Sequence, residues 1–393
     1  MAYAVLRGTL VSMAPLLLER ASELRDFVGS VVELRDSVGV LSVTIGIEPG
    51  AGSGGTPPWQ IALENDLAQA RHDGSLGRST KRRLEETSVR LAELLDTTST
   101  GKGRALYVAL ESGASREAML QRGLPTRARV GSVAHVLPLL EALDEGQPTG
   151  LIMASKDALV LWESELGGVT EVDHIELEPW VGDWWPEMKG PSRANPLRGQ
   201  HTVSQRDRYA RRIAVAYRHT LDEASLTLGT LARKRGWTRA VLAGDSRAIT
   251  ALDALLRHDG LTTITINANL EGLRTEDARG RLEAALDTLA ARRSLEHIRV
   301  IDEANGACGL ARVLTALNEA RVGSLLIDPS RTYTGLVEPG EILRAVDAGD
   351  GALDLTDVIV SRTLSTGAQV IPVFGAAAEH LSNCGGIAAL LRW

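Results

Sequence analysis

Several features are scarce in this chain of 393 residues, and each scarcity excludes a class of protein. Aromatic residues make up 4% of the sequence, so the cores must be built mainly from aliphatic side chains. No apolar stretch approaches the length that a membrane-spanning helix needs. The short apolar run over 13–18 also lacks the basic start and the cleavage site of a secretory leader. We therefore expect a cytoplasmic protein with no membrane partner.

Cysteine and paired histidines are also scarce. The two cysteines, Cys308 and Cys384, are too few for a disulfide framework, so we expect both to be small residues in or near the core, in a reducing compartment. No two of the eight histidines share a helical spacing, and only His380 lies near a cysteine. The glycine-flanked serine of the hydrolase nucleophile elbow is absent as well. We expect neither a bound metal nor a cofactor.

The net charge of −7 limits the range of partners. An acidic body does not coat nucleic acid with its whole surface, so we expect no DNA partner. One basic patch on such a body remains compatible with the composition. Hydrophobic and charged residues at 44% and 24% are ordinary for a globular protein. The length predicts two or three domains.

Hydrophobic periodicity predicts alternating helices and strands, and hence an α/β protein with several domains. The first domain, 1–145, is predicted to be mixed α/β. Its predicted elements are a helix over 16–27, a strand over 39–46, helices over 59–71 and 80–95, and a strand over 105–110.

The predicted middle domain, 146–271, follows a boundary rich in glycine and acidic residues. Closely spaced strands over 150–154, 158–162 and 168–172 predict an antiparallel meander. A long helix over about 204–234 carries one apolar stripe and is predicted to end at Gly236 in a left-handed cap. A strand over 240–243 and a helix over 247–257 follow, with Asp245 or Ser246 as the predicted cap.

The third predicted domain, 272–393, alternates helices and strands and suggests a layered sandwich. Its predicted helices cover 275–292, 309–320 and 355–364, and its predicted strands cover 297–301, 323–328, 369–374 and 385–391.

One basic segment stands out from the acidic chain. Between residues 195 and 219, six arginines face the single Asp207, which gives a local charge of +5. The arginines are Arg198, Arg206, Arg208, Arg211, Arg212 and Arg218. They cannot all lie on the buried stripe of the predicted helix, so one face must be cationic. Arginine binds phosphate in a bidentate manner and stacks on bases, which favours RNA as the partner. The alternative is an ordinary basic helix that pairs with acidic neighbours.

The order of features around this segment resembles a known family. An irregular loop, Gly199-Gln200, small polar residues and an arginine-rich helix containing Tyr209 resemble the middle domain of the archaeal and eukaryotic class-one peptide release factors. Residues 190–200 and 203–208 look like the bacterial branch, which includes the Balon-type ribosome hibernation factors of actinobacteria. The resemblance implies a ribonuclease-H-like middle domain. It also implies a C-terminal α/β/α sandwich like that of kink-turn-binding ribosomal proteins.

The resemblance implies a ribosome-associated translation factor that occupies the A site, with a hibernation or stress role ranked first. The N-terminal domain would lie in the decoding region, and the loop over 195–203 would reach the peptidyl-transferase centre. The C-terminal domain would contact EF-Tu or another translational GTPase. The implied rRNA-binding residues are Arg198, His201, Arg206, Arg208, Arg211, Arg212 and Arg218.

Two alternatives stay open. In a release or rescue factor, Gln200 and Gly199 would carry peptidyl-tRNA ester hydrolysis, while Arg198 and His201 would position the ester. Arg198 stands where the family has the first glycine of its Gly-Gly-Gln loop, and backbone conformations open to glycine are costly for arginine, so we rank hydrolysis second. Residues 1–145 contain no Asn-Ile-Lys-Ser element, which disfavours stop-codon decoding. A protein-interaction scaffold would leave the local charge of +5 unexplained.

Overall fold

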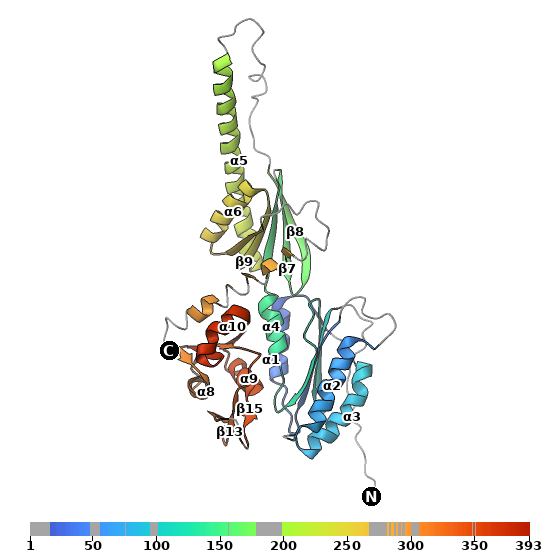
Figure 1. Ribbon diagram of the computed structural model, residues 1–393. Coiled ribbons are helices and arrows are strands. Elements are labelled where there is room, and N and C mark those ends of the chain that lie inside the picture. The colour runs from blue at the N-terminus through green and yellow to red at the C-terminus, as the bar shows by residue number, and fades with distance from the viewer. Residues whose placement is uncertain are drawn as a thin grey trace. The chain divides into compact units, whose positions relative to one another are not determined.

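The chain forms two compact units in the computed structural model (Figure 1). Unit 1 comprises residues 1–147, 165–168 and 290–393, and unit 2 comprises 148–164 and 169–289. The predicted boundaries of three domains, after 145 and 271, stay a prediction. The residues that the structure describes are 16–47, 56–74, 76–94, 101–155, 157–177, 199–266, 281–299 without 283, 287, 290, 291, 293 and 294, and 306–393 without 348 and 350. Across these residues, none of the helices is long and apolar enough to span a membrane.

The first part of unit 1 is a five-stranded sheet covered by helices on both faces. Its elements are β1 (Leu16–Leu18), α1 (Ala21–Val32), β2 (Val40–Gly46), α2 (Pro58–His72), α3 (Arg78–Leu94), β3 (Gly103–Ala109), β4 (Ser115–Leu120), β5 (Arg127–Gly131) and α4 (Leu137–Glu145). The strand order is β1-β4-β3-β2-β5, and only β1 pairs in parallel. Side chains alternate along β3: Tyr107 joins the core with α1 and α4, whereas Leu106 joins the core with α2 and α3.

Most predicted elements of this part are confirmed, since α2, α3, β2 and β3 lie where the periodicity placed them. The helix predicted over 16–27 is wrong at its start. Leu16–Leu18 forms β1 against β4, and α1 begins only at Ala21. The Glu23 carboxylate accepts the backbone N–H groups of Glu19 and Arg20 at 3.0 and 3.2 Å. This local capping of the first turn fixes the helix start beyond the apolar run.

The C-terminal part of unit 1 is a four-stranded sheet with flanking helices. Its elements are β11 (Ala307–Cys308), α8 (Leu310–Asn318), β12 (Val322–Ile327), β13 (Thr334–Glu338), β14 (Ile342–Ala345), β15 (Leu353–Asp354), α9 (Thr356–Ser365), β16 (Gln369–Pro372), α10 (Gly375–Leu381), the 3-10 helix η3 (Ser382–Cys384) and β17 (Ile387–Leu391). The sheet order is β11-β17-β12-β16, and β14-β13-β15 forms a separate small sheet. Val28 of α1 and Leu139 of α4 share one core with Leu314 and Ile359.

Five predicted elements of this part are confirmed. The helices α8 and α9 lie at the predicted ranges 309–320 and 355–364, and the strands β12, β16 and β17 lie at 323–328, 369–374 and 385–391. The predicted strand over 297–301 is wrong, because residues 295–299 are helical. Leu295 and Ile298 are three residues apart and pack together against α10, as neighbours on one helix face do. The sequence also gave no indication of the sheet formed by β13, β14 and β15.

Unit 2 contains a five-stranded sheet with two helices on one face. Its elements are β6 (Thr149–Ala154), β7 (Ala158–Glu165), β8 (Gly168–Glu176), α5 (Gly199–Arg235), β9 (Arg239–Gly244), α6 (Ser246–His258) and β10 (Thr262–Ile266). The order is β10-β9-β6-β7-β8; β6 is antiparallel to β7 and parallel to β9. A meander of three strands followed by two helical crossovers confirms the predicted ribonuclease-H-like domain. Asp245 caps α6, as predicted, by accepting the N–H groups of Arg247 and Ala248.

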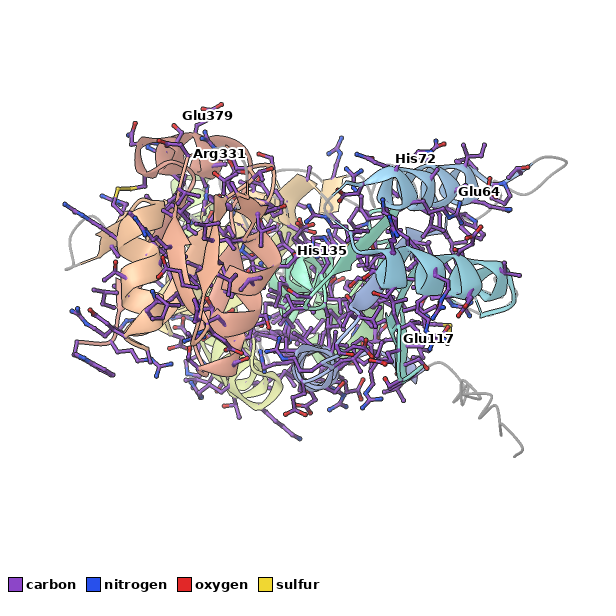
Figure 2. The ribbon with its side chains drawn as sticks, turned by 90° about the horizontal axis from the view of Figure 1, so that it is seen from below. Glu64, His72, Glu117, His135, Arg331 and Glu379 are labelled. Atoms are coloured by element: carbon purple, nitrogen blue, oxygen red, sulfur yellow. A yellow bond between two sulfur atoms is a disulfide. The ribbon has the colours of Figure 1, made fainter. Side chains whose placement is uncertain are left out.

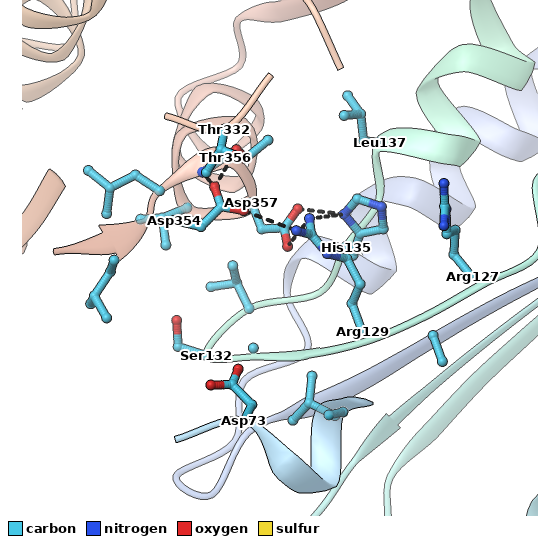
Figure 3. A pocket seen from close by; sticks show the side chains of 18 of the residues that line it. Asp73, Arg127, Arg129, Ser132, His135, Leu137, Thr332, Asp354, Thr356 and Asp357 are labelled. Atoms are coloured by element: carbon cyan, nitrogen blue, oxygen red, sulfur yellow. Dashed lines mark hydrogen bonds and ion pairs between the residues drawn. The ribbon is translucent and has the colours of Figure 1, made fainter. Parts of the chain in front are cut away.

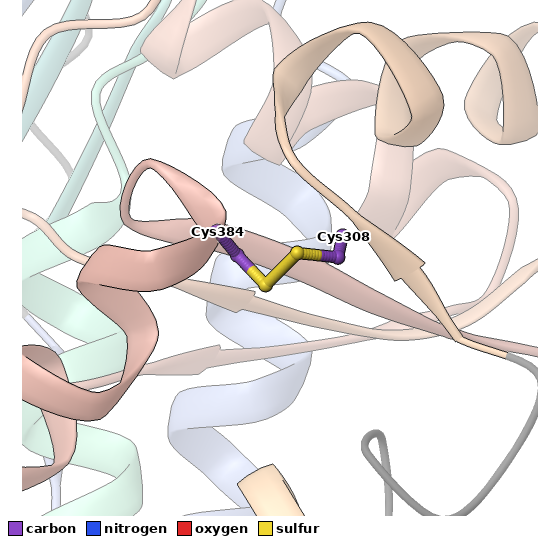
Figure 4. The surroundings of a disulfide bond; sticks show 2 residues. All are labelled: Cys308 and Cys384. Carbon is purple, nitrogen blue, oxygen red and sulfur yellow. A yellow bond between two sulfur atoms is a disulfide. The ribbon is translucent and has the colours of Figure 1, made fainter.

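The two cysteines are joined in a disulfide, which corrects the expectation of two unpaired core thiols (Figure 4). Cys308 lies on β11 and Cys384 at the end of η3, with their Cα atoms 5.0 Å apart. They are separated by 76 residues in sequence. The pairing of β11 with β17 brings Cys308 beside the turn that precedes β17, and no local pattern in the sequence reveals this neighbourhood.

Candidate nucleic-acid interface

The C-terminal half of α5 is anchored in the core of unit 2. Leu221, Ala224 and Leu228 are buried there against the sheet, which confirms that half of the predicted apolar stripe. Gly236 ends the helix in the left-handed conformation that the sequence predicted, with a φ of 70°. The backbone N–H of Trp237 then bonds to the carbonyl of Ala232 at 2.8 Å, which completes the C-terminal cap.

Trp237 fixes the anchored end of α5 to the sheet. Its indole N–H donates to the Glu163 carboxylate at 2.6 Å, and Arg235 pairs with the same carboxylate at 3.2 Å. The indole ring lies against Gly150 of β6, where an added Cβ would sit 2.3 Å from a ring carbon. Glycine is therefore required at Gly150 because the ring and the strand approach so closely.

The outer part of α5, residues 211–220, contains no buried residue. Figure 1 shows that α5 extends past the ends of the strands of its own unit. With 37 residues, α5 is about 55 Å long. Arg211, Arg212 and Arg218 are exposed there, and Val215 leaves 70% of its surface in solvent. The outer part is thus a cationic rod, in which Tyr217 still packs against the core of unit 2.

Few acidic side chains accompany the charges on this rod. Among the side chains that the structure describes, no ion pair joins Arg211 or Arg218 to a carboxylate, and His219 pairs with Glu223 at 3.5 Å. Arg211, Arg212, Val215 and His219 also border a shallow hollow of about 380 Å³. Guanidinium groups beside a small apolar surface suit phosphate contacts combined with stacking.

The structure describes the predicted site residues to different extents. Arg198 lies outside the described residues. Gly199, Gln200, His201, Arg206 and Arg208 lie on the first turns of α5, and only their backbone is described. The predicted loop over 195–203 is therefore corrected, because the helix begins at Gly199 rather than near 204. No proline follows Pro196 before the arginine-rich stretch, so nothing in the chain prevents this earlier start. The roles of these residues stay predictions.

Sequence reasoning missed a charged network within unit 1. It lines a cleft of about 1100 Å³ and joins β5 and the segment after it to the start of α9 (Figure 3). His135 Nδ1 lies 2.6 Å from an Asp357 carboxylate oxygen. Arg129 donates to Asp354 at 3.0 Å and pairs with Asp357 at 3.5 Å. Figure 2 locates His135 among the side chains of this unit. More than 200 residues separate the partners in sequence, so no local pattern could reveal them.

Buried titratable groups surround His135. Burial raises the pKa of Glu141 on α4 to about 7, and the opposing effect of His135 is smaller. Burial, reinforced by the Asp357 carboxylate, raises the pKa of the Tyr107 hydroxyl. That hydroxyl donates to the carbonyl of His135 at 3.2 Å. Of these two groups, Tyr107 is fully buried and Glu141 is partly buried.

No cluster of three or more histidine, cysteine or acidic residues that could hold a metal ion occurs within the described part of the chain. The arrangement around α5 offers exposed arginine side chains, which suit contacts with anionic groups.

Comparison with known proteins agrees with this geometry. Residues 135–293 match the family model described as bacterial archaeo-eukaryotic release factor family 10. This stretch includes β6 to β10 with α5 and α6. No curated protein matches the chain.

Several solved structures of translation factors are similar to this chain at low identity and low TM-score. An archaeal translation termination factor, aRF1, is 19% identical over 96% of this chain and 99% of its own, with a TM-score of 0.26. Pelota from Archaeoglobus fulgidus is 15% identical over 74% and 79% of the two chains, with a TM-score of 0.33. Dom34 from S. cerevisiae, a translation termination-like factor that interacts with Hbs1, is 11% identical over 74% and 79%, with a TM-score of 0.34.

The family match confirms the predicted resemblance to the release-factor superfamily over residues 135–293. This part of the molecule is thus a release-factor-like domain. It has a ribonuclease-H-like fold and carries a long cationic helix. Within that class, residues 135–293 are similar to family 10 of the bacterial branch. Similarity to the Balon-type subgroup stays a prediction.

Proposed function

We propose that the protein is a ribosome-associated translation factor that occupies the A site and acts in hibernation or stress. The observation that carries the proposal is the exposed cationic rod at residues 211–220 of a release-factor-like domain. Arg211 and Arg218 are exposed, so their guanidinium groups can reach phosphate groups. An arginine rod held away from the core can enter a polyanionic cavity.

The family resemblance supports a proposed placement for each part. The segment over 195–203, with Gln200 at the second residue of α5, would reach the peptidyl-transferase centre. The N-terminal domain would lie in the decoding region. The C-terminal domain would contact EF-Tu or another translational GTPase; among relatives of similar fold, Dom34 is described as interacting with Hbs1. The working compartment would be the cytoplasm, where ribosomes act.

Salt-dependent co-sedimentation with purified ribosomes tests the proposal. Replacing Arg211, Arg212 and Arg218 with Glu is expected to weaken binding and to lower the salt slope by about 1 for each lost phosphate contact. Lys234→Glu is the matched control, because Lys234 is exposed at the anchored end of the same helix. Equal losses from the triple variant and the control, or no loss from either, would overturn the proposal.

Peptide release from a stalled complex separates the alternative role. An A-site binding factor is expected to release no labelled peptide above background. Release that Gln200→Ala abolishes would instead assign peptidyl-tRNA hydrolysis to the segment.

A further inference from the structure

The disulfide between Cys308 and Cys384 is chemically asymmetric. Cys308 on β11 is exposed, whereas Cys384 is half-buried and packs against the apolar cluster of α10, β16 and β17. Figure 4 shows the bond between β11 and the turn that precedes β17. The chain contains no other cysteine, so any thiol reaction of this protein must involve Cys308 or Cys384.

The bond also joins two weakly held segments. The strand β11 has two residues and, among the described strands, pairs with β17 alone. Beyond it, the N–H of Gly309 bonds to the carbonyl of Ile387 at 3.0 Å. On the other side, η3 is a single short turn between α10 and β17. A two-residue edge strand has few backbone bonds of its own, so the cross-link carries much of its attachment.

We propose that Cys308–Cys384 is a thiol-exchange site, at which an external thiolate attacks the Cys308 sulfur. The attack forms a mixed disulfide at Cys308 and breaks the Cys308–Cys384 bond, and Cys384 leaves as a thiolate that takes a proton from water. A second thiolate then attacks the external sulfur of the mixed disulfide and releases Cys308. In sum, one protein disulfide and two external thiols become two protein thiols and one external disulfide.

Exchange changes the attachment of β11 and η3. The reduced protein is expected to hold β11 only through its two-residue ladder with β17, so the Gly309 amide becomes more accessible. The site rests on the geometry of the two cysteines and is independent of whether the protein binds ribosomes.

Trapping on the unaltered protein tests the direction of attack. The full-length protein is treated with a limiting amount of reduced glutathione, quenched with acid and mapped by mass spectrometry. The adduct is expected on Cys308; an adduct predominantly on Cys384 would overturn the proposal. In a parallel arm, dithiothreitol is expected to yield two free thiols where none titrates before. Two free thiols before reduction would show that the bond is absent and would equally overturn it.

Two single-cysteine variants give a matched comparison. Cys384→Ser leaves the exposed Cys308, and Cys308→Ser leaves the half-buried Cys384. Alkylation by iodoacetamide is expected to be at least about tenfold faster for Cys384→Ser. Equal rates would contradict the asymmetry.

The structural consequence is measured on the wild-type protein in both redox states. Hydrogen exchange at Gly309 is expected to accelerate on reduction, while exchange in β2 and β3 stays unchanged. Opening a cross-link over 76 residues is expected to lower the Tm of unit 1 by about 5–10 °C. Identical exchange at Gly309 and an identical Tm in the two states would show that the bond does not secure β11.

Discussion

Glu141 provides a sharp prediction about stability and pH. It lies on α4 and is partly buried, and this burial raises the pKa of its carboxyl from 4.5 to about 7. A difference of about 2.5 units corresponds to roughly 3 kcal/mol between the charged and neutral forms. The folded state keeps the proton more tightly than the unfolded state does. The contribution of Glu141 to stability is therefore fully present below pH 4.5 and is lost as the pH rises towards 7.

Replacing Glu141 with Gln removes this titration and keeps the shape of the side chain. The difference in unfolding free energy, variant minus wild type, is expected to be small near pH 4 and to reach about +1 to +3 kcal/mol near pH 8. Urea unfolding at a series of pH values measures it, and the titration of groups that do not interact with Glu141 cancels in the difference. Glu64→Gln, on the exposed face of α2, controls for the chemical change and is expected to shift stability by less than about 0.5 kcal/mol.

A difference for Glu141→Gln that is flat between pH 4 and 8 would refute the reasoning. A difference that falls with pH would mean that folding lowers the pKa of Glu141, because His135 keeps its carboxylate charged in the folded protein.

Three further changes test individual contacts by urea unfolding. Asp357→Asn removes the carboxylate that pairs with His135, and because both side chains are more than four-fifths buried, it is expected to cost on the order of 1–3 kcal/mol; a loss below about 0.5 kcal/mol would mean that the network contributes little. Gly150→Ala places a methyl group against the Trp237 ring and is expected to cost about 1–3 kcal/mol, whereas an unchanged midpoint would mean that the ring can move. Asp245→Ala removes the cap of α6 and is expected to cost about 1 kcal/mol, most of which Asp245→Ser should restore.

The parts of the fold that could be predicted are those with strong local periodicity. The alternating segments over 150–172 became the meander, and the spacing of Leu221, Ala224 and Leu228 marked the buried face of α5. Gly236 forms the predicted C-terminal cap of α5, and Asp245 forms the predicted N-terminal cap of α6. Both could be predicted because capping depends on backbone conformation and side chains within a few residues.

The features that could not be predicted have two causes, which are long separation in sequence and short segment length. The disulfide and the network of Arg129, His135 and Asp357 join residues far apart in sequence, and only the folded topology brings them together. The apolar run at 297–301 is too short for its period to distinguish a strand from a helix. The strands β14 and β15 are so short that the pattern offered nothing to find.

The candidate site was predicted in part. The arginines of the outer helix could be assigned to a cationic face by counting, because six charges cannot share one buried stripe. The distance of these arginines from the core could not be predicted, since it depends on where the sheet of unit 2 ends. The helix start at Gly199 was missed because glycine and small polar residues favour loops in most contexts, and here they lie on the first turns.

The position of the protein on a purified ribosome tests the central claim most directly. Chemical footprinting of the rRNA, with the occupancy of the tRNA sites recorded, is the measurement. We expect protection in the decoding region and at the peptidyl-transferase centre of ribosomes with a vacant A site, and loss of both when Arg211, Arg212 and Arg218 are replaced with Glu. Protection confined to rRNA outside the tRNA sites, or binding that persists beside an A-site tRNA, would contradict the account.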